Sequence, residues 1–248
     1  MAVAVITGVS RRIGIGAAVA RRLAEAGWDL FLHSWSPHDA EQPWGADPEG
    51  AAAIVADLRT RVRVEHLVAD LADPDAPAQL VAAAEGAYGR VDALVANHAR
   101  SSVATLEELT AAELDFTYAV NTRATLLLVK EFAARCPGPG RVVLMTSGQH
   151  RGPMPGELPY IASKEALHQV TASLAAHLAP RGITVNAVDP GATDTGYADA
   201  AAHAAVLALE PMGRWGEPDD AARLIAWLAS DAGRWVTGQV LVSNGGGP

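Results

Sequence analysis

Residues 2–21 read AVAVITGVSRRIGIGAAVAR: an apolar run, a glycine-rich turn and a helix-forming stretch. The apolar run predicts a buried strand over 2–7, and the last stretch predicts a helix over 15–26. Glycines between a first strand and a first helix let the backbone approach a pyrophosphate, to which the helix N-terminus offers free N–H groups. A glycine-rich loop without a ligand is the alternative.

The same alternation of apolar runs and helical patterns continues along the chain and predicts a parallel, doubly wound α/β sheet of Rossmann type. The strands are near-continuous apolar runs, so helices are expected on both faces of a seven-stranded, mostly parallel sheet. We found no linker and no repeat, and expect one domain over 1–248. Strands are expected near 2–7, 29–33, 62–68, 91–96, 141–146, 183–188 and 238–242. Helices are expected near 15–26, 48–61, 75–88, 111–135, 158–179, 196–209 and 218–230.

Local signals place several helix ends. Asp47-Pro48 predicts an N-cap followed by proline in the first turn, and Thr110 with Glu113 has capping-box spacing. Gly27 and Gly182 stand where helices commonly end in glycine.

Composition and charge argue against several classes of function. The chain has 248 residues, a formal net charge of −9 and no block of Lys or Arg, which argues against nucleic acid or an anionic membrane as the main partner. Cys136 is the only cysteine, so neither a disulfide framework nor a cysteine-based zinc site is expected, and we assigned no metal ligands. The apolar start is too short for a signal peptide, which predicts a cytoplasmic location.

The stretch from Ser147 to Lys164 carries the candidate chemistry. Tyr160 and Lys164 are four residues apart and share one face of a predicted helix. A free phenol has a pKa of about 10, and a nearby ammonium is expected to lower it. A serine at a strand end can hold a carbonyl oxygen beside that phenol, which gives a general acid for a forming alkoxide. A chance pair on an amphipathic helix is the alternative.

With these two motifs the chain resembles the short-chain dehydrogenase/reductase family, over nearly its whole length and nearest to reductases of 3-oxoacyl thioesters. The family's first turn is two residues shorter, so Arg12-Ile13 is read as an insertion. The resemblance implies that Ser147 hydrogen-bonds the substrate oxygen, Tyr160 exchanges the proton, and Lys164 lowers the Tyr pKa and binds the nicotinamide ribose. It also implies that Asn121, in the helix 111–135, holds a water of the proton relay.

The dinucleotide is expected to be NADP(H), with NAD(H) possible. The second strand ends in Leu32-His33-Ser34-Trp35-Ser36, with no acid to bind a ribose 2′-OH. Arg11 and Arg12 could pair with a 2′-phosphate, or could both face solvent. The expected cofactor-binding residues are Thr7, Gly8, Ser10, Arg11, Arg12, Gly14, Ile15, Gly16, Ser34, Asp70, Leu71, Asn97, Tyr160, Lys164, Pro190, Gly191 and Thr193.

Several assignments keep two readings. Asp70 is either an adenine contact or a solvated loop residue, and Thr195 competes with Thr193 for the cofactor. The segment 193–212 is expected to be a substrate lid, although a plain surface helix has the same composition. The last helix and strand suit either a homotetramer or homodimer interface or ordinary core packing. The expected substrate-binding residues are Ser147, Gln149, His150, Met154, Tyr160, Tyr197 and His203.

The sequence therefore predicts an NADP(H)-dependent carbonyl reductase or alcohol dehydrogenase. The alternative is a catalytically silent NADP(H)-binding regulatory protein, against which the set of Asn121, Ser147, Tyr160 and Lys164 argues. Fold analogy does not choose among the many substrates of the scaffold.

Overall fold

One sheet of seven parallel strands, in the order β3-β2-β1-β4-β5-β6-β7, runs through the computed structural model, which describes residues 1–247. All seven predicted strands are confirmed. They are β1 (Val3–Ile6), β2 (Asp29–Ser34), β3 (Val64–Val68), β4 (Ala93–Ala96), β5 (Gly140–Met145), β6 (Ile183–Asp189) and β7 (Val240–Val242). The order reverses between β1 and β4, so the loops after β1 and β4 diverge and open a crevice at the carboxyl edge of the sheet.

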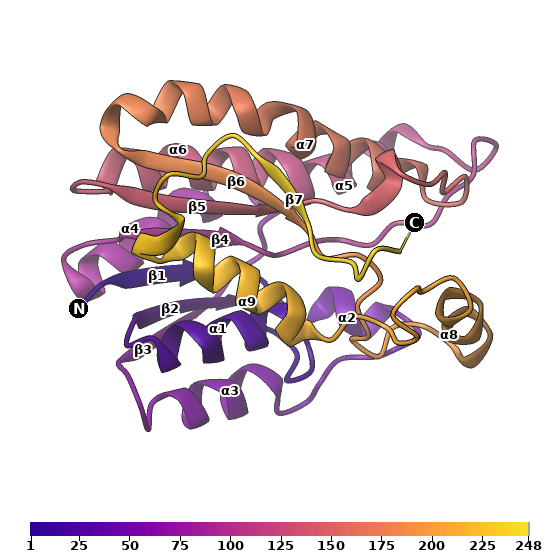
Figure 1. Cartoon of the computed structure of the whole chain (residues 1–248), viewed down its shortest axis with the longest axis horizontal. Coiled ribbons are helices and arrows are strands. Elements are labelled where there is room, and N and C mark those ends of the chain that lie inside the picture. The colour runs from indigo at the N-terminus through magenta and orange to yellow at the C-terminus, as the bar shows by residue number, and fades with distance from the viewer. Residues whose placement is uncertain (248) are drawn as a thin grey trace.

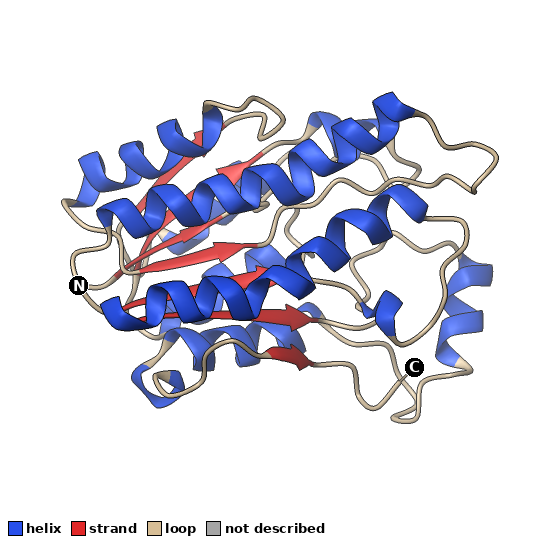
Figure 2. Ribbon diagram, turned by 90° about the horizontal axis from the view of Figure 1, so that it is seen from above, coloured by secondary structure: helices blue, strands red, loops and turns tan. Residues whose placement is uncertain are grey.

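Helices cover both faces of the sheet, as the apolar strands predicted (Figures 1 and 2). One core cluster joins α1, α3 and α9 to one face, and a second joins α4, α6 and α7 to the other. The α-helices are α1 (Ile15–Glu25), α2 (Pro37–Glu41), α3 (Gly50–Leu58), α4 (Ala76–Tyr88), α5 (Ala111–Tyr118), α6 (Ala124–Arg135), α7 (Leu158–Leu178), α8 (Ala200–Leu207) and α9 (Pro218–Ala229). No helix among residues 1–247 is long and apolar enough to cross a bilayer.

Several observed helices differ from the predicted ones. The helix expected over 111–135 is divided by a π-helical turn, η1 (Ala119–Arg123), which lies between α5 and α6. The helix α8 is shorter than the predicted 196–209, and the short α2 was not predicted.

The signals for helix ends had mixed outcomes. Thr110 accepts a hydrogen bond from the backbone N–H of Glu113, and Gly27 and Gly182 have positive φ, as predicted. The Asp47 cap was wrong, because α3 begins at Gly50 and the Asp47 carboxylate binds an arginine instead.

Candidate active site

The glycine-rich turn between β1 and α1 forms a cradle that side chains cannot enter. Gly8 has a φ of +72°, and a Cβ there would lie 2.7 Å from the Cα of His98. A Cβ on Gly16 would lie 2.6 Å from the carbonyl oxygen of Gly8. Asn97 holds the turn from the neighbouring strand, because its amide Nδ2 donates to the carbonyls of Thr7 and Gly8, each at 3.1 Å. The turn is therefore held in a shape in which no side chains cover its backbone at Gly8 and Gly16.

A cavity of about 360 Å³ opens beside this cradle. The predicted cofactor residues in its wall are Gly8, Ser10, Arg11, Gly14, Ile15, Asp70, Leu71 and Asn97. Residues that sequence reasoning missed also line it, among them Trp35, Pro37, His38, Asp39 and Glu41. Most of these lie in α2 and the residues just before it, whose short helix gave no periodic signal.

Four predicted cofactor residues from the first half of the chain lie outside the cavity wall. Thr7 is buried beneath the turn, where its hydroxyl oxygen accepts from the backbone N–H of Asn97 at 3.0 Å. Gly16 packs against Gly8, as described above. The Ser34 hydroxyl is hydrogen-bonded to His66 at 2.8 Å. The side chain of Arg12 forms ion pairs instead of lining the wall.

The two arginines of the turn therefore have different environments. The Arg12 guanidinium binds the Asp47 carboxylate, with Nε 2.9 Å from Oδ2, and reaches Glu49 at 3.2 Å. These contacts raise the pKa of Arg12 and lower the pKa of Asp47. Arg11 lies in the cavity wall, and its Nη2 approaches the space beside Gly196. Of the two arginines in the turn, Arg11 is the one placed to contact a ligand in the cavity.

The predicted cofactor residues Pro190, Gly191 and Thr193 form a turn after β6. Gly191 has a φ of +64°, and its N–H donates to the Asp189 carboxylate at 2.9 Å. The Thr193 hydroxyl donates to the carbonyl of Pro190 at 3.0 Å, which closes this turn. The cavity wall contains Thr195, not the preferred Thr193.

Two histidines lie buried under the cavity. His33 accepts from the Gly8 N–H at Nδ1 and contacts the Ala69 carbonyl at 2.9 Å through Nε2. His98 contacts the Thr7 hydroxyl at 2.7 Å and the Val120 carbonyl at 3.0 Å. Burial lowers the pKa of His33 to about 4 and that of His98 to about 3, so both rings are neutral near pH 7.

Ser147, Tyr160 and Lys164 come together where β5 meets α7. Ser147 follows β5, and its hydroxyl lies near enough to the Tyr160 hydroxyl to lower the pKa of that phenol. The Lys164 Nζ lies 5.8 Å from the centre of the Tyr160 ring and donates to the Met145 carbonyl at 3.0 Å. Burial lowers the pKa of Lys164 to about 8.

The predicted effect of Lys164 on the phenol was wrong for this state of the protein. The pKa of Tyr160 is raised, first by burial and then by the negative charge of Glu157, while the neighbouring Ser147 hydroxyl acts in the opposite direction. The Lys164 ammonium donates to the Met145 carbonyl, and it is not one of the groups that shift the pKa of Tyr160. Desolvation of the phenolate outweighs its nearest partners.

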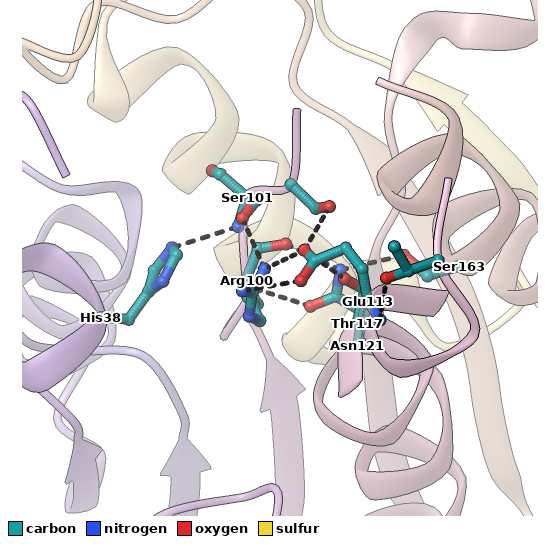
Figure 3. A network of polar contacts seen from close by, with 9 residues as sticks. His38, Arg100, Ser101, Glu113, Thr117, Asn121 and Ser163 are labelled. Carbon is teal, nitrogen blue, oxygen red and sulfur yellow. Dashed lines mark hydrogen bonds and ion pairs between the residues drawn. The ribbon is translucent and has the colours of Figure 1, made fainter. Parts of the chain in front are cut away.

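Asn121 is anchored in the π-helical turn by three hydrogen bonds (Figure 3). Its Nδ2 donates to Ser163 Oγ at 2.9 Å and to the Arg100 carbonyl at 3.0 Å, and its Oδ1 accepts from the Arg100 N–H at 2.6 Å. The Arg100 guanidinium in turn pairs with Glu113 at 2.7 Å. The extra residue of a π turn lets the side chain face α7 from inside a continuous helix.

This network continues across the cavity (Figure 3). The N–H of Ser101 donates to Nε2 of His38 at 3.1 Å, and both His38 and Arg100 line the cavity. The loop after β4 is thereby tied to α2 on one side and to α7 on the other. Sequence reasoning missed Arg100 and Glu113, because nothing in the linear pattern shows that they meet.

The predicted substrate residues do not form one group. Gln149 donates to the Ser147 hydroxyl at 2.8 Å, and Tyr197 lies near enough to raise the pKa of Tyr160. His203 stacks on Trp215 with ring centres 4.8 Å apart. His150 contacts residues of α7, described below, and Met154 is partly buried in the loop before α7.

Comparison with known proteins agrees with this geometry. A family model described as enoyl-(acyl carrier protein) reductase matches residues 8–247. The chain belongs to the short-chain dehydrogenase/reductase family and is an oxidoreductase of that family.

Three similar proteins illustrate the relationship. The uncharacterized oxidoreductase YjdA of Bacillus subtilis is 42% identical over 248 residues, covering 98% of this chain and 96% of the relative. An NADPH-dependent aldehyde reductase-like chloroplastic protein of Arabidopsis thaliana is 34% identical, covering 98% and 93%. The crystal structure of a blue fluorescent protein from a metagenomic library, in complex with NADPH, has a TM-score of 0.89 and 35% identity, covering 99% and 97%.

Proposed function

We propose that this protein transfers a hydride between NADP(H) and a carbonyl or secondary alcohol substrate, with Tyr160 as the general acid and base. The observation that carries the proposal is the meeting of Ser147, Tyr160 and Lys164 at the end of β5, beside the crevice where the strand order reverses. Relatives described as NADPH-dependent, and a similar structure that contains NADPH, support the cofactor.

The cradle fits a dinucleotide. The glycines at 8 and 16 exclude side chains from the turn, and the N-terminus of α1 offers backbone N–H groups to a pyrophosphate. Arg11 is the candidate for a ribose 2′-phosphate, while Asp70, Leu71 and Asn97 would border the adenine and the ribose. The turn at Pro190 and Gly191, with Thr195 or Thr193, would border the nicotinamide.

The residues at the end of β5 would perform the proton chemistry. Bound NADPH supplies a hydride to the carbonyl carbon and is itself oxidised, and the electron pair of the C=O bond moves to the oxygen. Ser147 would hydrogen-bond that oxygen, and Tyr160 would donate its proton to it, leaving an alcohol and a phenolate. Lys164 would bind the nicotinamide ribose, the other role that the resemblance implies for it. Gln149 fixes the Ser147 hydroxyl, and Asn121 holds the loop and helix that flank Tyr160.

We further propose that the segment 193–212 covers the substrate, since Tyr197 reaches both Trp44 and Trp215 through edge-to-face contacts. An assembly of two or four chains through α9 and β7 is also proposed. Trp227 is 42% exposed and Trp235 is 94% exposed on that side, a large apolar area for a free surface. Light scattering on purified protein tests the assembly, and a monomeric mass contradicts it.

The direct test compares wild-type protein with Tyr160→Phe. NADPH oxidation is followed with a panel of aldehydes and ketones, and NADPH affinity is measured by calorimetry. Tyr160→Phe should keep NADPH binding and lose turnover by about 10²–10⁴-fold, the usual contribution of a general acid. Tyr118→Phe, at an exposed position of α5, is the matched control and should keep both.

Two results would contradict the proposal. Turnover within a few-fold of wild type in Tyr160→Phe removes this phenol as the acid. Wild-type protein that binds NADPH but reduces no carbonyl of the panel favours the regulatory alternative.

A further inference from the structure

A second cluster of ligating side chains joins the segment after Ser147 to α7. His150 comes from the short helical turn η2 (Gly148–His150), and Glu165 and His168 come from α7. One ligating atom from each residue lies within 4.8 Å of the other two. These residues have no contact with the cavity wall and belong to no part of the proposed hydride chemistry.

The contacts inside the cluster are too long for hydrogen bonds. Nδ1 of His150 lies 3.8 Å from Oε1 of Glu165, and Nδ1 of His168 lies 3.6 Å from Oε2. Oε1 of Glu165 and Nδ1 of His168 are shielded from solvent and have no hydrogen-bond partner. Buried polar atoms without partners are rare and point to a missing water or ion. Here both unpartnered atoms belong to the same cluster.

A tetrahedral zinc ion explains this arrangement. Zinc binds histidine nitrogen and carboxylate oxygen at 2.0–2.1 Å, so neighbouring ligand atoms lie about 3.4 Å apart. The observed 3.8 and 3.6 Å, which run to the two different oxygens of the Glu165 carboxylate, are within a few tenths of an ångström of that spacing. Glu165 and His168 are three residues apart and share one helix face, as in Glu-x-x-His metal motifs. Two imidazoles favour zinc over magnesium or calcium, which prefer oxygen ligands.

We propose that His150, Glu165 and His168 bind one Zn²⁺ through the two Nδ1 atoms and the carboxylate, with a water in the fourth position. The ion would join the segment after β5 to α7. That segment carries Ser147 and Gln149, and Glu165 directly follows Lys164. Metal binding would therefore hold the two halves of the proposed active site together from outside it. In the sequence the two histidines and the glutamate are spread over nineteen residues, and only the folded chain brings them together.

Calorimetry with ZnCl₂ on untagged protein, treated with a chelator and dialysed, tests the site. Wild-type protein should bind one equivalent of Zn²⁺. Glu165→Gln and His150→Ala should each weaken that binding by at least about tenfold, since even residues behind the ligands cost 10–100-fold in metal affinity. His177→Ala is the matched control, because His177 lies exposed on the same helix and outside the cluster.

A spectroscopic measurement provides an independent readout. Co²⁺ in place of Zn²⁺ should give the strong visible absorption of a tetrahedral site in wild type and His177→Ala, and not in the cluster variants. Circular dichroism confirms that each variant is folded, and His150, whose partly exposed side chain packs on the His168 ring, lies outside both core clusters. The proposal is overturned if wild-type protein takes up no Zn²⁺, or if His150→Ala and Glu165→Gln bind it as tightly as His177→Ala.

Discussion

The two buried histidines under the cavity should make the protein sensitive to mild acid. The Gly8 N–H points at Nδ1 of His33, so this nitrogen accepts and Nε2 carries the proton that is donated to the Ala69 carbonyl. In His98, Nε2 donates to the Val120 carbonyl and Nδ1 accepts from the Thr7 hydroxyl. A second proton on either ring would sit on Nδ1, where it would face the Gly8 N–H in His33 or the Thr7 hydroxyl in His98. The ring centres are 6.4 Å apart, so two charged rings would also repel each other.

The size of the effect follows from the pKa values. Folding lowers the pKa from 6.5 to about 4 for His33 and to about 3 for His98, so the unfolded chain binds more protons below pH 6.5. The free energy of unfolding must therefore fall as the pH falls through this range. At pH 5 each ring is 1.5 pH units below its unfolded pKa, which costs about 2 kcal/mol per histidine and about 4 kcal/mol for both. That is a large part of the stability of an ordinary domain.

Urea denaturation between pH 7.5 and pH 5 measures the effect. His33→Gln should lose about half of the decrease, since an amide does not titrate, even if the variant is less stable at every pH. His177→Gln, at an exposed position of α7, should keep the full decrease. A decrease in His33→Gln as steep as in wild type would show that this ring is not held neutral by the fold.

The remaining predictions concern the cofactor and the proton. Gly16→Ala should weaken NADPH binding by at least tenfold in calorimetry, because its Cβ would lie 2.6 Å from the Gly8 carbonyl oxygen and the turn must open. Arg11→Gln should weaken NADPH by about tenfold or more and leave NADH unchanged, as expected for one charge-assisted hydrogen bond to a 2′-phosphate; equal losses for both would contradict this role. Glu157→Gln removes a charge that raises the pKa of Tyr160, so the pH profile of alcohol oxidation should move to lower pH.

The fold could be predicted almost completely from the sequence, and the reason is visible in the strands. β1 and β4 are buried along their whole length, and every residue in them is apolar, so their sequence signal is unambiguous. The features that were missed have no periodic signal. α2 has five residues and none of them is buried, and the π turn η1 differs from the helices around it by a single extra residue.

Part of the candidate site could be predicted from the sequence, but the contacts between its residues could not. The spacing of Ser147, Tyr160 and Lys164 placed them together, because a strand end and one helix turn fix that geometry locally. The separation of Arg11 from Arg12 depends on Asp47 and Glu49, which reach the turn only when α3 packs beside α1. The direction of the Tyr160 pKa shift depends on burial and on Glu157, and neither can be read from a four-residue spacing.

That direction bears on which way the proposed reaction runs. With a raised pKa, Tyr160 carries its proton near neutral pH, and Lys164, with a pKa of about 8, is largely charged there. A forming alkoxide is about as basic as hydroxide, whose parent water has a pKa of about 15.7, so even a weakened phenol donates to it favourably. The reverse reaction needs a phenolate as base, which burial and Glu157 both oppose. We therefore infer that the resting protein is prepared for carbonyl reduction, and that alcohol oxidation requires the site first to lose a proton.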